Sequence, residues 1–568
     1  MKNTTIWMAL AVLLSACESF LDRSPIDKIG SDDYFRTARD LELYVNQFYE
    51  HLPSFGDFGA GVYWSDDNSD NMVYEEYNVR LAGYTTIPGN AKDAKWEWDK
   101  IRSVNYFIGN YHRSEDAPSE NSQYIGEGHF FRAYFYYDLL MKFGDLPWVN
   151  AAYDAESPEL YNERLPRNVI ADSILVDLDK AIACLNGKNE VAENRISKEV
   201  ALLFKSRVAL FEGTWEKYHA GTVFAPAQSE PARYFRQAAD AAGLLMEMNT
   251  FSVFTTGDER TAYYELFNKN DYAKNPEVML WRKYSLALGL THRLQGYLLY
   301  RGSRRGFTKD FVDDCLFTDG LPRIAHPEFS DKTLADVVKD RDPRLAQMMW
   351  VPGDIRVVKG SEISYFDKPF IDQTGEYNCL TGYQLKKGAD PYVTDQDNSE
   401  TGLPLFRYAE ALLNYAEAKA ELGELTQADI DKSINKLRDR VGIASLNRTA
   451  ITKDPAWKFP EVSPVLNEIR RERRIELACE GFRFTDLLRW KAAEQLVNKR
   501  PRGFYFNPDE FPDLIPGKDI RLDAEGYIDP YKESLPGGYQ FNSQRDYLLP
   551  LPTSELVLNK KLKQNPGW

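Results

Sequence analysis

The sequence has few of the residues from which metal sites and disulfide frameworks are built. Its 568 residues include 5 cysteines and 6 histidines. The cysteines are scattered without a C-x-x-C spacing, and the histidines form no H-E-x-x-H pair. These absences argue against a zinc site with the usual spacing of cysteine and histidine ligands, and against a small domain stabilised by disulfides.

Motifs of common enzyme classes are missing as well. The glycines at 126 and 128 lack the third glycine of a nucleotide-binding loop, and no G-x-S-x-G elbow occurs. Carboxylates are plentiful in a chain with 86 acidic residues, so composition alone does not rule out a glycosidase. We nevertheless expect the protein not to be an enzyme.

An excess of positive charge and long apolar runs are also lacking. The 70 basic and 86 acidic residues give a formal charge of -16. This charge argues against a nucleic-acid partner, because phosphate recognition requires a clustered basic surface. After the N-terminal stretch, no run reaches the roughly 18 consecutive apolar residues that a membrane-spanning helix needs.

The N-terminus has the proportions of an export signal. Lys2 precedes an apolar stretch from Ile6 to Leu14, which is followed by Ser15, Ala16 and Cys17. The small residues before a single cysteine resemble a bacterial lipobox, in which the signal is removed and the cysteine is lipidated. We therefore predict a lipoprotein signal peptide at residues 1–16, lipidation of Cys17, and a chain that is anchored to a membrane without spanning it. The alternative is an ordinary signal peptide with an incidental cysteine.

Helical periodicity dominates the first half of the chain and returns near its C-terminal third. Apolar residues recur at spacings of three and four in the following ranges: 39–49, 95–111, 127–143, 168–185, 198–218, 232–248, 405–422, 427–441 and 465–496. Alanines 201 and 209 face 238 and 242, and 416 and 420 face 428, as in helix pairs of the tetratricopeptide type. The pattern predicts a mostly α fold.

Between these helical parts lies a long segment of a different character. Residues 251–401 contain short β-branched or aromatic runs with many Gly, Pro, Asp and Tyr. We interpret them as a loop-rich insertion into one domain that spans residues 17–568, with scaffold helices over about 38–250 and 403–498. Long irregular segments on a rigid scaffold are where binding function usually lies.

Charged runs in the sequence each have two interpretations. Residues 66–70 and 395–399 begin like calcium loops but lack the glycine and the final glutamate that such loops need. We interpret both as surface turns, with an irregular calcium site as the alternative. The basic run at 470–474 is either an anion site or a helix whose arginines pair with nearby acids, and we favour the helix.

Aromatic residues gather in two loops. Tyr63, Trp64, Tyr74, Tyr77 and Tyr84 crowd a polar stretch, and Tyr297 and Tyr300 precede Arg301, Arg304 and Arg305. A sugar presents an apolar C–H face and a fringe of hydroxyls, so its site combines flat rings with Asp, Asn and Arg side chains. Rings packed into the core are the alternative for each aromatic residue, and for Trp281, which lies in a strand-like run, the core is the preferred interpretation.

Several motifs occur in an order that resembles one family from end to end. After the lipobox they are FLDRSP at 20–25, GHFFRAYFYYDLL at 128–140, FGDLP at 143–147, RDPR at 341–344, PLFRYAEALLNYAEA at 404–418, RRIELACEGFR at 473–483, DLLRW at 486–490, YLLPLP at 547–552 and NP at 565–566. In this order and spacing they resemble the SusD/RagB family of outer-membrane lipoproteins of Bacteroidetes.

The resemblance implies a SusD-like fold with four tetratricopeptide-like helix pairs and a variable loop-rich face. It also implies a non-catalytic protein exposed at the cell surface. Such proteins bind an oligosaccharide and deliver it to a SusC-like TonB-dependent transporter in the outer membrane, without a required cofactor. A member that binds peptides, or an adaptor with no ligand of its own, is the alternative.

The family motifs lie on predicted scaffold helices, so the candidate contacts come from the chemistry of the loops. Arg356 and Tyr383 are added because both lie in a part of the insertion rich in Gly and Tyr. The full set of candidate glycan-binding residues is Tyr63, Trp64, Asp67, Tyr74, Tyr77, Arg80, Tyr84, Tyr297, Tyr300, Arg301, Arg356 and Tyr383.

Overall fold

The computed structural model describes residues 34–568 except 155 and 394. The predicted signal peptide at 1–16 and the predicted lipidation site Cys17 lie outside the described residues. Within the described part, no helix combines the length and apolarity needed to cross a membrane.

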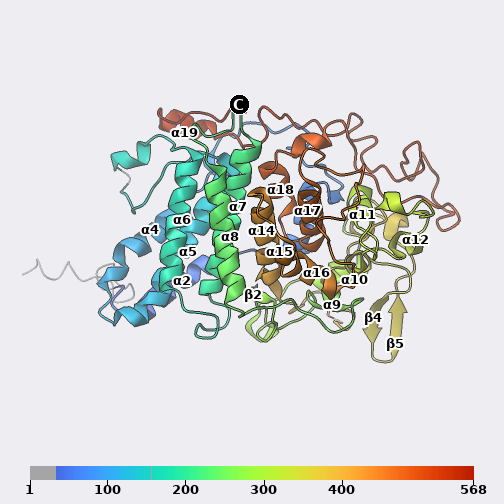
Figure 1. Ribbon diagram of the computed structural model, residues 1–568, viewed down its shortest axis with the longest axis horizontal. Helices are drawn as coiled ribbons and strands as arrows, with labels where there is room; N and C mark the ends of the chain where they lie inside the picture. The colour runs from blue at the N-terminus through green and yellow to red at the C-terminus, as the bar shows by residue number, and fades with distance from the viewer. Residues whose placement is uncertain (1–33, 155, 394) are drawn as a thin grey trace, which may run out of the picture.

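The first half of the chain is a helical scaffold, as predicted. Its main helices are α2 (Ala38–Asn46), α4 (Asp99–Asn110), α5 (Pro118–Phe143), α6 (Arg167–Cys184), α7 (Lys198–Tyr218) and α8 (Pro231–Glu247). Neighbouring helices pack as pairs, α5 on α6 and α7 on α8, and Figure 1 shows them side by side on the left of the molecule. The mostly α fold expected from the sequence is confirmed.

Small residues set the distance between α7 and α8. Ala209 and Ala238 are fully buried where the two helices pack. A Cβ on Gly213 would lie 2.9 Å from the ring of Phe235, so this position requires glycine for close approach. Ser197 begins α7 by accepting a hydrogen bond from the backbone N–H of Val200.

The C-terminal helices complete the scaffold. They are α14 (Tyr408–Glu421), α15 (Gln427–Asp431), α16 (Ile434–Arg440), α17 (Pro464–Glu476), α18 (Arg483–Arg489) and α19 (Thr553–Leu558). Helix α14 packs against α8 on one side and α17 on the other, which joins the two halves of the scaffold. Helix α14 also meets α15, the segment that contains residue 428, since the hydroxyl of Tyr415 donates to Oδ1 of Asp429 at 2.7 Å.

Two predicted helices are interrupted. The helix expected over 427–441 breaks between Asp431 and Ile434 into α15 and α16. The helix expected over 465–496 ends at Glu476, because Cys479 and Gly481 adopt left-handed backbone angles, with φ of 63° and 85°. The turn between them redirects the chain into α18.

The segment between the scaffold halves contains short helices and strands joined by loops. The helices are α9 (Ala262–Glu265), α10 (Leu294–Tyr300), α11 (Lys309–Asp314), α12 (Leu334–Val338) and α13 (Pro343–Met348), and the strands are β2 (Val278–Arg282), β3 (Arg305–Phe307), β4 (Ile355–Lys359) and β5 (Glu362–Tyr365). Strand β2 pairs antiparallel with β6 (Leu403–Arg407), β4 with β5, and β3 with β1 (Met72–Tyr74).

The basic run of α17 lies inside the protein. Arg470, Arg471, Arg473 and Arg474 are each at most 5% exposed, and each forms an ion pair with at least one carboxylate. Some partners are near in the sequence, such as Asp486 for Arg473, and others are farther away, such as Glu421 for Arg470. The prediction that this run is an ion-paired helix is therefore confirmed.

Candidate functional site

The two aromatic loops predicted from the sequence meet at the β1–β3 sheet. Met72 pairs with Phe307 and Tyr74 with Arg305 across the strands. Residues 61–68 form a 3-10 segment just before β1, and α10 ends just before β3. This pairing brings together side chains that are 238 residues apart in the sequence, such as Asp67 and Arg305.

Arg305 lies between two aromatic rings. Its guanidinium carbon is 4.0 Å from the ring centroid of Trp64 and 3.9 Å from that of Tyr74. Nε of Arg305 donates a hydrogen bond of 3.0 Å to Oδ2 of Asp67. Cation–π contacts of this kind hold both rings in place. We call Trp64, Asp67, Tyr74, Tyr297, Arg301, Arg305 and Tyr377 the aromatic cluster.

Tyr297 extends the cluster from α10. Its ring meets the ring of Trp64 edge to face, with centroids 5.2 Å apart. The guanidinium carbon of Arg301 lies 5.0 Å from the Tyr297 ring centroid and 5.6 Å from that of Tyr377, which is 46% exposed. Nε of Arg301 donates to Oε1 of Glu376 at 3.0 Å. The cluster therefore continues outward to exposed ring surface.

A strained turn holds Arg301 and Arg305 in position. Ser303 and Arg304 have left-handed backbone angles, with φ of 59° and 53°, and such a conformation costs about 1 to 2 kcal/mol per residue. Hydrogen bonds to a neighbouring loop stabilise it, since the N–H of Ser303 donates to the carbonyl of Glu376 at 2.7 Å and that of Arg304 to Asn378 at 2.8 Å. Strain of this kind is frequent at binding sites.

The chemistry of the aromatic cluster fits a hydroxylated ligand. Aromatic rings can stack on an apolar C–H face, guanidinium groups donate hydrogen bonds, and carboxylates accept them. Burial raises the pKa of Asp67, and the neighbouring Arg305 opposes that rise. The side chains of Arg305 and Asp67 are 15% and 24% exposed, so both are held in place without being sealed from solvent.

Two other predicted residues form a separate pair. The ring centroids of Tyr77 and Tyr84 are 6.0 Å apart, and Tyr84 is 57% exposed. Tyr77 also contacts the ring of Tyr531, whose hydroxyl donates to the carbonyl oxygen of Tyr74 at 2.5 Å. This pair adjoins the aromatic cluster through Tyr531.

Arg356 and Tyr300 lie in another small group. The guanidinium carbon of Arg356 is 5.8 Å from the ring centroid of Tyr300 and 5.0 Å from that of Phe370. Burial lowers the pKa of Arg356. The hydroxyl of Tyr300 and Nε of Arg356 are buried and have no hydrogen-bond partner among the described residues.

Three predicted ligand contacts are wrong, because their side chains lie inside the protein. Tyr63 is 1% exposed, packing edge to face against Phe55, and Tyr383 is 0% exposed, packing against Phe504. Arg80 is 8% exposed and donates to the carbonyl oxygen of Asp546 at 2.6 Å. Tyr63 lies next to Trp64 in a 3-10 turn, and neighbouring positions there point to different sides.

Sequence reasoning missed three contributors. Arg305 lies beside the second aromatic loop but is not among the predicted glycan-binding residues. Glu376 and Tyr377 are not among them either. A tyrosine next to a glycine and an acid at 375–377 has the same composition as the selected loops, so Tyr377 could have been found. The role of Arg305 follows from strand pairing, which the sequence does not display.

The acidic run at 66–70 is not the surface turn that we expected, because Asp66 and Asp70 are only 1% and 8% exposed. Asp66 accepts hydrogen bonds from Nδ2 of Asn71 and from the backbone N–H of Cys479, and Asp67 pairs with Arg305. Asp70 pairs with Arg483 at 2.7 Å. In the part of the chain that the structure describes, no group of three or more His, Cys, Asp or Glu residues is arranged to hold a metal.

The second acidic run forms a surface turn. Oδ1 of Asp395 accepts hydrogen bonds from the backbone N–H groups of Asp397 and Asn398, at 3.0 and 3.1 Å. Asp397 in turn pairs with Arg293 at 3.2 Å.

Two arginines of the family motif near residue 480 form hydrogen bonds with the segment that leads into β1. Arg474 on α17 donates to Oδ1 of Asn71 at 2.8 Å, and Nε of Arg483 donates to Oδ1 of Asp70 at 2.7 Å. Both acceptors lie just before β1. The motif residues therefore position the segment that carries Trp64 and Asp67, and they do not belong to the exposed ring surface.

Two family models match the chain. The model of the SusD family matches residues 248–568, and a model described as "Starch-binding associating with outer membrane" matches residues 19–210. Together they span both halves of the scaffold.

Named relatives and solved structures agree with these models. SusD-like proteins P38 and P2 of Formosa agariphila are 23% and 22% identical, covering 87% and 100% of this chain and 93% and 100% of their own lengths. A SusD-like protein of Bacteroides fragilis has a TM-score of 0.72 at 23% identity, covering 96% of this chain and 100% of its own. A SusD-like carbohydrate binding protein of the same organism has a TM-score of 0.72 at 22% identity, with coverages of 93% and 99%. At these identities the solved structures show the fold.

Proposed function

The chain belongs to the SusD family, and from that premise we propose that it is a non-catalytic lipoprotein of the cell surface that binds an oligosaccharide. Binding takes place at the aromatic cluster. The bound glycan is then delivered to a SusC-like TonB-dependent transporter in the outer membrane. A lipid on Cys17 anchors the protein there, and no cofactor is required.

The observation that carries the proposal is the convergence of rings and charged groups from two distant loops. Arg305 occupies the space between Trp64 and Tyr74, so these two rings form a rigid base. Tyr297 and Tyr377, on either side of Arg301, offer the ring surface for stacking. Preorganised rings reduce the entropy lost on binding, which favours a small polar ligand such as a sugar.

The names of similar proteins support this reading of the site. One neighbour in the SusD fold is named a carbohydrate binding protein, and one matching family model describes starch binding with outer-membrane association. The lipobox residues before Cys17 support the anchor.

Isothermal titration of the chain from Ser19 onward tests the proposal, and this form retains every residue that the structure describes. We expect binding to at least one member of a panel of plant, microbial and host oligosaccharides. Tyr297→Ala and Tyr377→Ala should each weaken that binding by about 1 kcal/mol, the contribution of a ring contact. Tyr365→Ala is the control, because Tyr365 is 56% exposed on β5 and lies outside the aromatic cluster.

The result also separates the alternatives. Binding of short peptides in place of every sugar would assign the site to peptides. Capture that is unchanged in both tyrosine variants would place the ligand elsewhere. Reducing ends released during long incubation with the bound glycan would contradict the non-catalytic assignment. Co-purification with a TonB-dependent transporter from outer membranes tests the partner.

A further inference from the structure

A polar cavity adjoins the β1–β3 sheet, with Ser69 and Asp70 just before β1 and Thr308 just after β3 in its lining. It has a volume of about 370 Å³ and opens between α11, α18 and the loops that follow α18. Its polar lining includes Thr308, Asp310, Lys458, Lys499 and Arg502, and its apolar lining is formed by Leu487, Leu496, Pro501 and the ring of Tyr539. The volume is at the lower end of the range for small-molecule sites, which begins near 300 Å³.

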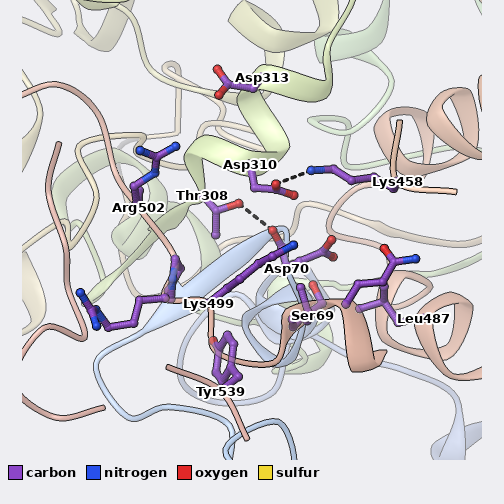
Figure 2. A pocket seen from close by; sticks show the side chains of 14 residues that line it. Ser69, Asp70, Thr308, Asp310, Asp313, Lys458, Leu487, Lys499, Arg502 and Tyr539 are labelled. Atoms are coloured by element: carbon purple, nitrogen blue, oxygen red, sulfur yellow. Dashed lines mark hydrogen bonds and ion pairs between the residues drawn. The ribbon is translucent and has the colours of Figure 1, made fainter. Parts of the chain in front are cut away.

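The carboxylates that line this cavity are already neutralised. Asp70 pairs with Arg483 at 2.7 Å and with Arg474 at 3.2 Å. Asp310 pairs with Arg474 at 2.9 Å and also with Lys458, as Figure 2 shows. Each carboxylate therefore has a cationic partner within the protein.

The third acid and the two arginines of the lining are paired as well. Asp313 accepts from Nζ of Lys309 at 2.8 Å. Arg500 pairs with Asp529 at 2.8 Å, and Arg502 pairs with Glu525 at 2.9 Å.

Lys499, an exposed residue at the rim of the cavity, is the exception in this lining. Its side chain reaches across the cavity toward Thr308 and Asp70 in Figure 2. Among residues 34–568, leaving aside 155 and 394, no side chain or carbonyl pairs with its ammonium group. The rim of the cavity therefore carries one solvent-exposed ammonium group that no described carboxylate pairs with.

The backbone holds Lys499 in this position. The preceding residue, Asn498, has a left-handed φ of 61°, and its N–H donates to the carbonyl oxygen of Tyr539 at 2.8 Å. The N–H of Lys499 donates to Leu496 at 3.0 Å, and its carbonyl accepts from the N–H of Tyr539 at 3.0 Å. A Cβ on Gly538 would come within 2.7 Å of this backbone, so glycine permits the close approach.

We infer that this cavity is a second saccharide subsite, which takes a sugar residue carrying an anionic group, and that Lys499 binds that group. The inference rests on the proposed function. An anionic oxygen would form a charge-assisted hydrogen bond with the free ammonium, and a neutral hydroxyl would gain much less. The ring of Tyr539 with Leu487 and Leu496 supplies an apolar wall for the C–H face of the sugar.

The test uses three probes on the chain from Ser19 onward, with affinities measured by saturation-transfer NMR. Glucuronate and glucose 6-sulfate distinguish a carboxylate from a sulfate ester as the recognised group, and glucose is the neutral reference. We expect at least one anionic probe to bind about tenfold more tightly than glucose, as a hydrogen bond to a charged group allows. This preference should shrink between about 20 mM and about 500 mM salt.

Substitutions assign the preference to one residue. Lys499→Met keeps the length of the side chain and should reduce the affinity for the anionic probe about tenfold while leaving glucose unchanged. Lys499→Arg should retain most of the preference. Lys560→Met, at a lysine that is also exposed but lies outside this lining, is the control and should change nothing.

The outcomes separate this inference from the proposed function. If neutral oligosaccharides bind at the aromatic cluster but Lys499→Met has no effect on the anionic probes, only the second subsite is wrong. Equal affinities for glucose and both anions would overturn it in the same way. If no saccharide of any kind binds, the proposed function fails together with this inference.

Discussion

Replacing Arg474 tests whether buried ion pairs hold the aromatic cluster in place. The guanidinium of Arg474 is 1% exposed and lies 2.8 Å from Asp314, 2.9 Å from Asp310 and 3.2 Å from Asp70. Burial raises the pKa of Asp314, but Arg474 and Arg471 outweigh it and lower that pKa to about 2. Arg474→Met would leave these carboxylates without their shared partner.

The expected cost follows from that loss. Removing one partner of a buried ion pair destabilises a protein by about 3 to 5 kcal/mol. Here we expect the lower end of that range, because Asp70, Asp310 and Asp314 each keep a second cationic partner. Urea unfolding followed by circular dichroism measures the change. Because Arg474 also donates to Asn71 just before β1, the variant should lose affinity for the glycan as well.

A surface pair provides the comparison. Lys142 pairs with Asp138 at 2.7 Å, and the two side chains are 33% and 46% exposed. Lys142→Met should cost less than about 1 kcal/mol, because an exposed pair gains little over water. Equal losses in the two variants, or a loss below about 1 kcal/mol for Arg474→Met, would refute the reasoning.

Two further predictions concern pH and packing. Burial lowers the pKa of His219 to about 3, so the unfolded chain binds the proton first, and stability present above pH 6.5 is lost as pH falls. In urea unfolding, the free energy of unfolding of the unmodified protein should fall by about 2 kcal/mol from this histidine between pH 6.5 and pH 5. The variant His219→Gln should not show this part of the fall. A Cβ on Gly59 would lie 2.0 Å from the Trp64 ring, so Gly59→Ala should weaken glycan binding in titrations. Gly257→Ala, with a similar φ and no neighbour within 4 Å, should not.

The sequence was sufficient for the scaffold because each helix is encoded locally. The range predicted for α7, 198–218, is the range observed. The interpretation of the basic run at 470–474 was also correct, since flanking apolar residues made a helix with paired arginines the favoured choice. The break after Glu476 was missed, because left-handed angles at Cys479 have no signature in a non-glycine residue.

The aromatic cluster was only partly predictable. Loop composition identified Trp64 and Tyr297, which the structure brings together. The position of Arg305 depends on the pairing of β1 with β3, two three-residue strands whose register is set by the whole fold. Tyr383 was misassigned for the same reason, since burial in a loop depends on what packs over it.

The buried arginines of α17 and the turn after it impose an order on folding. Arg474 meets Asn71, 403 residues earlier in the chain, and Arg483 meets Asp70, 413 residues earlier. These two acceptors lack their arginine donors until α17 and the turn after it are in place. Contacts this remote in sequence slow folding, because a long loop must close before they form. We therefore expect the segment that carries Trp64 to reach its final position late in folding, after α17 has formed.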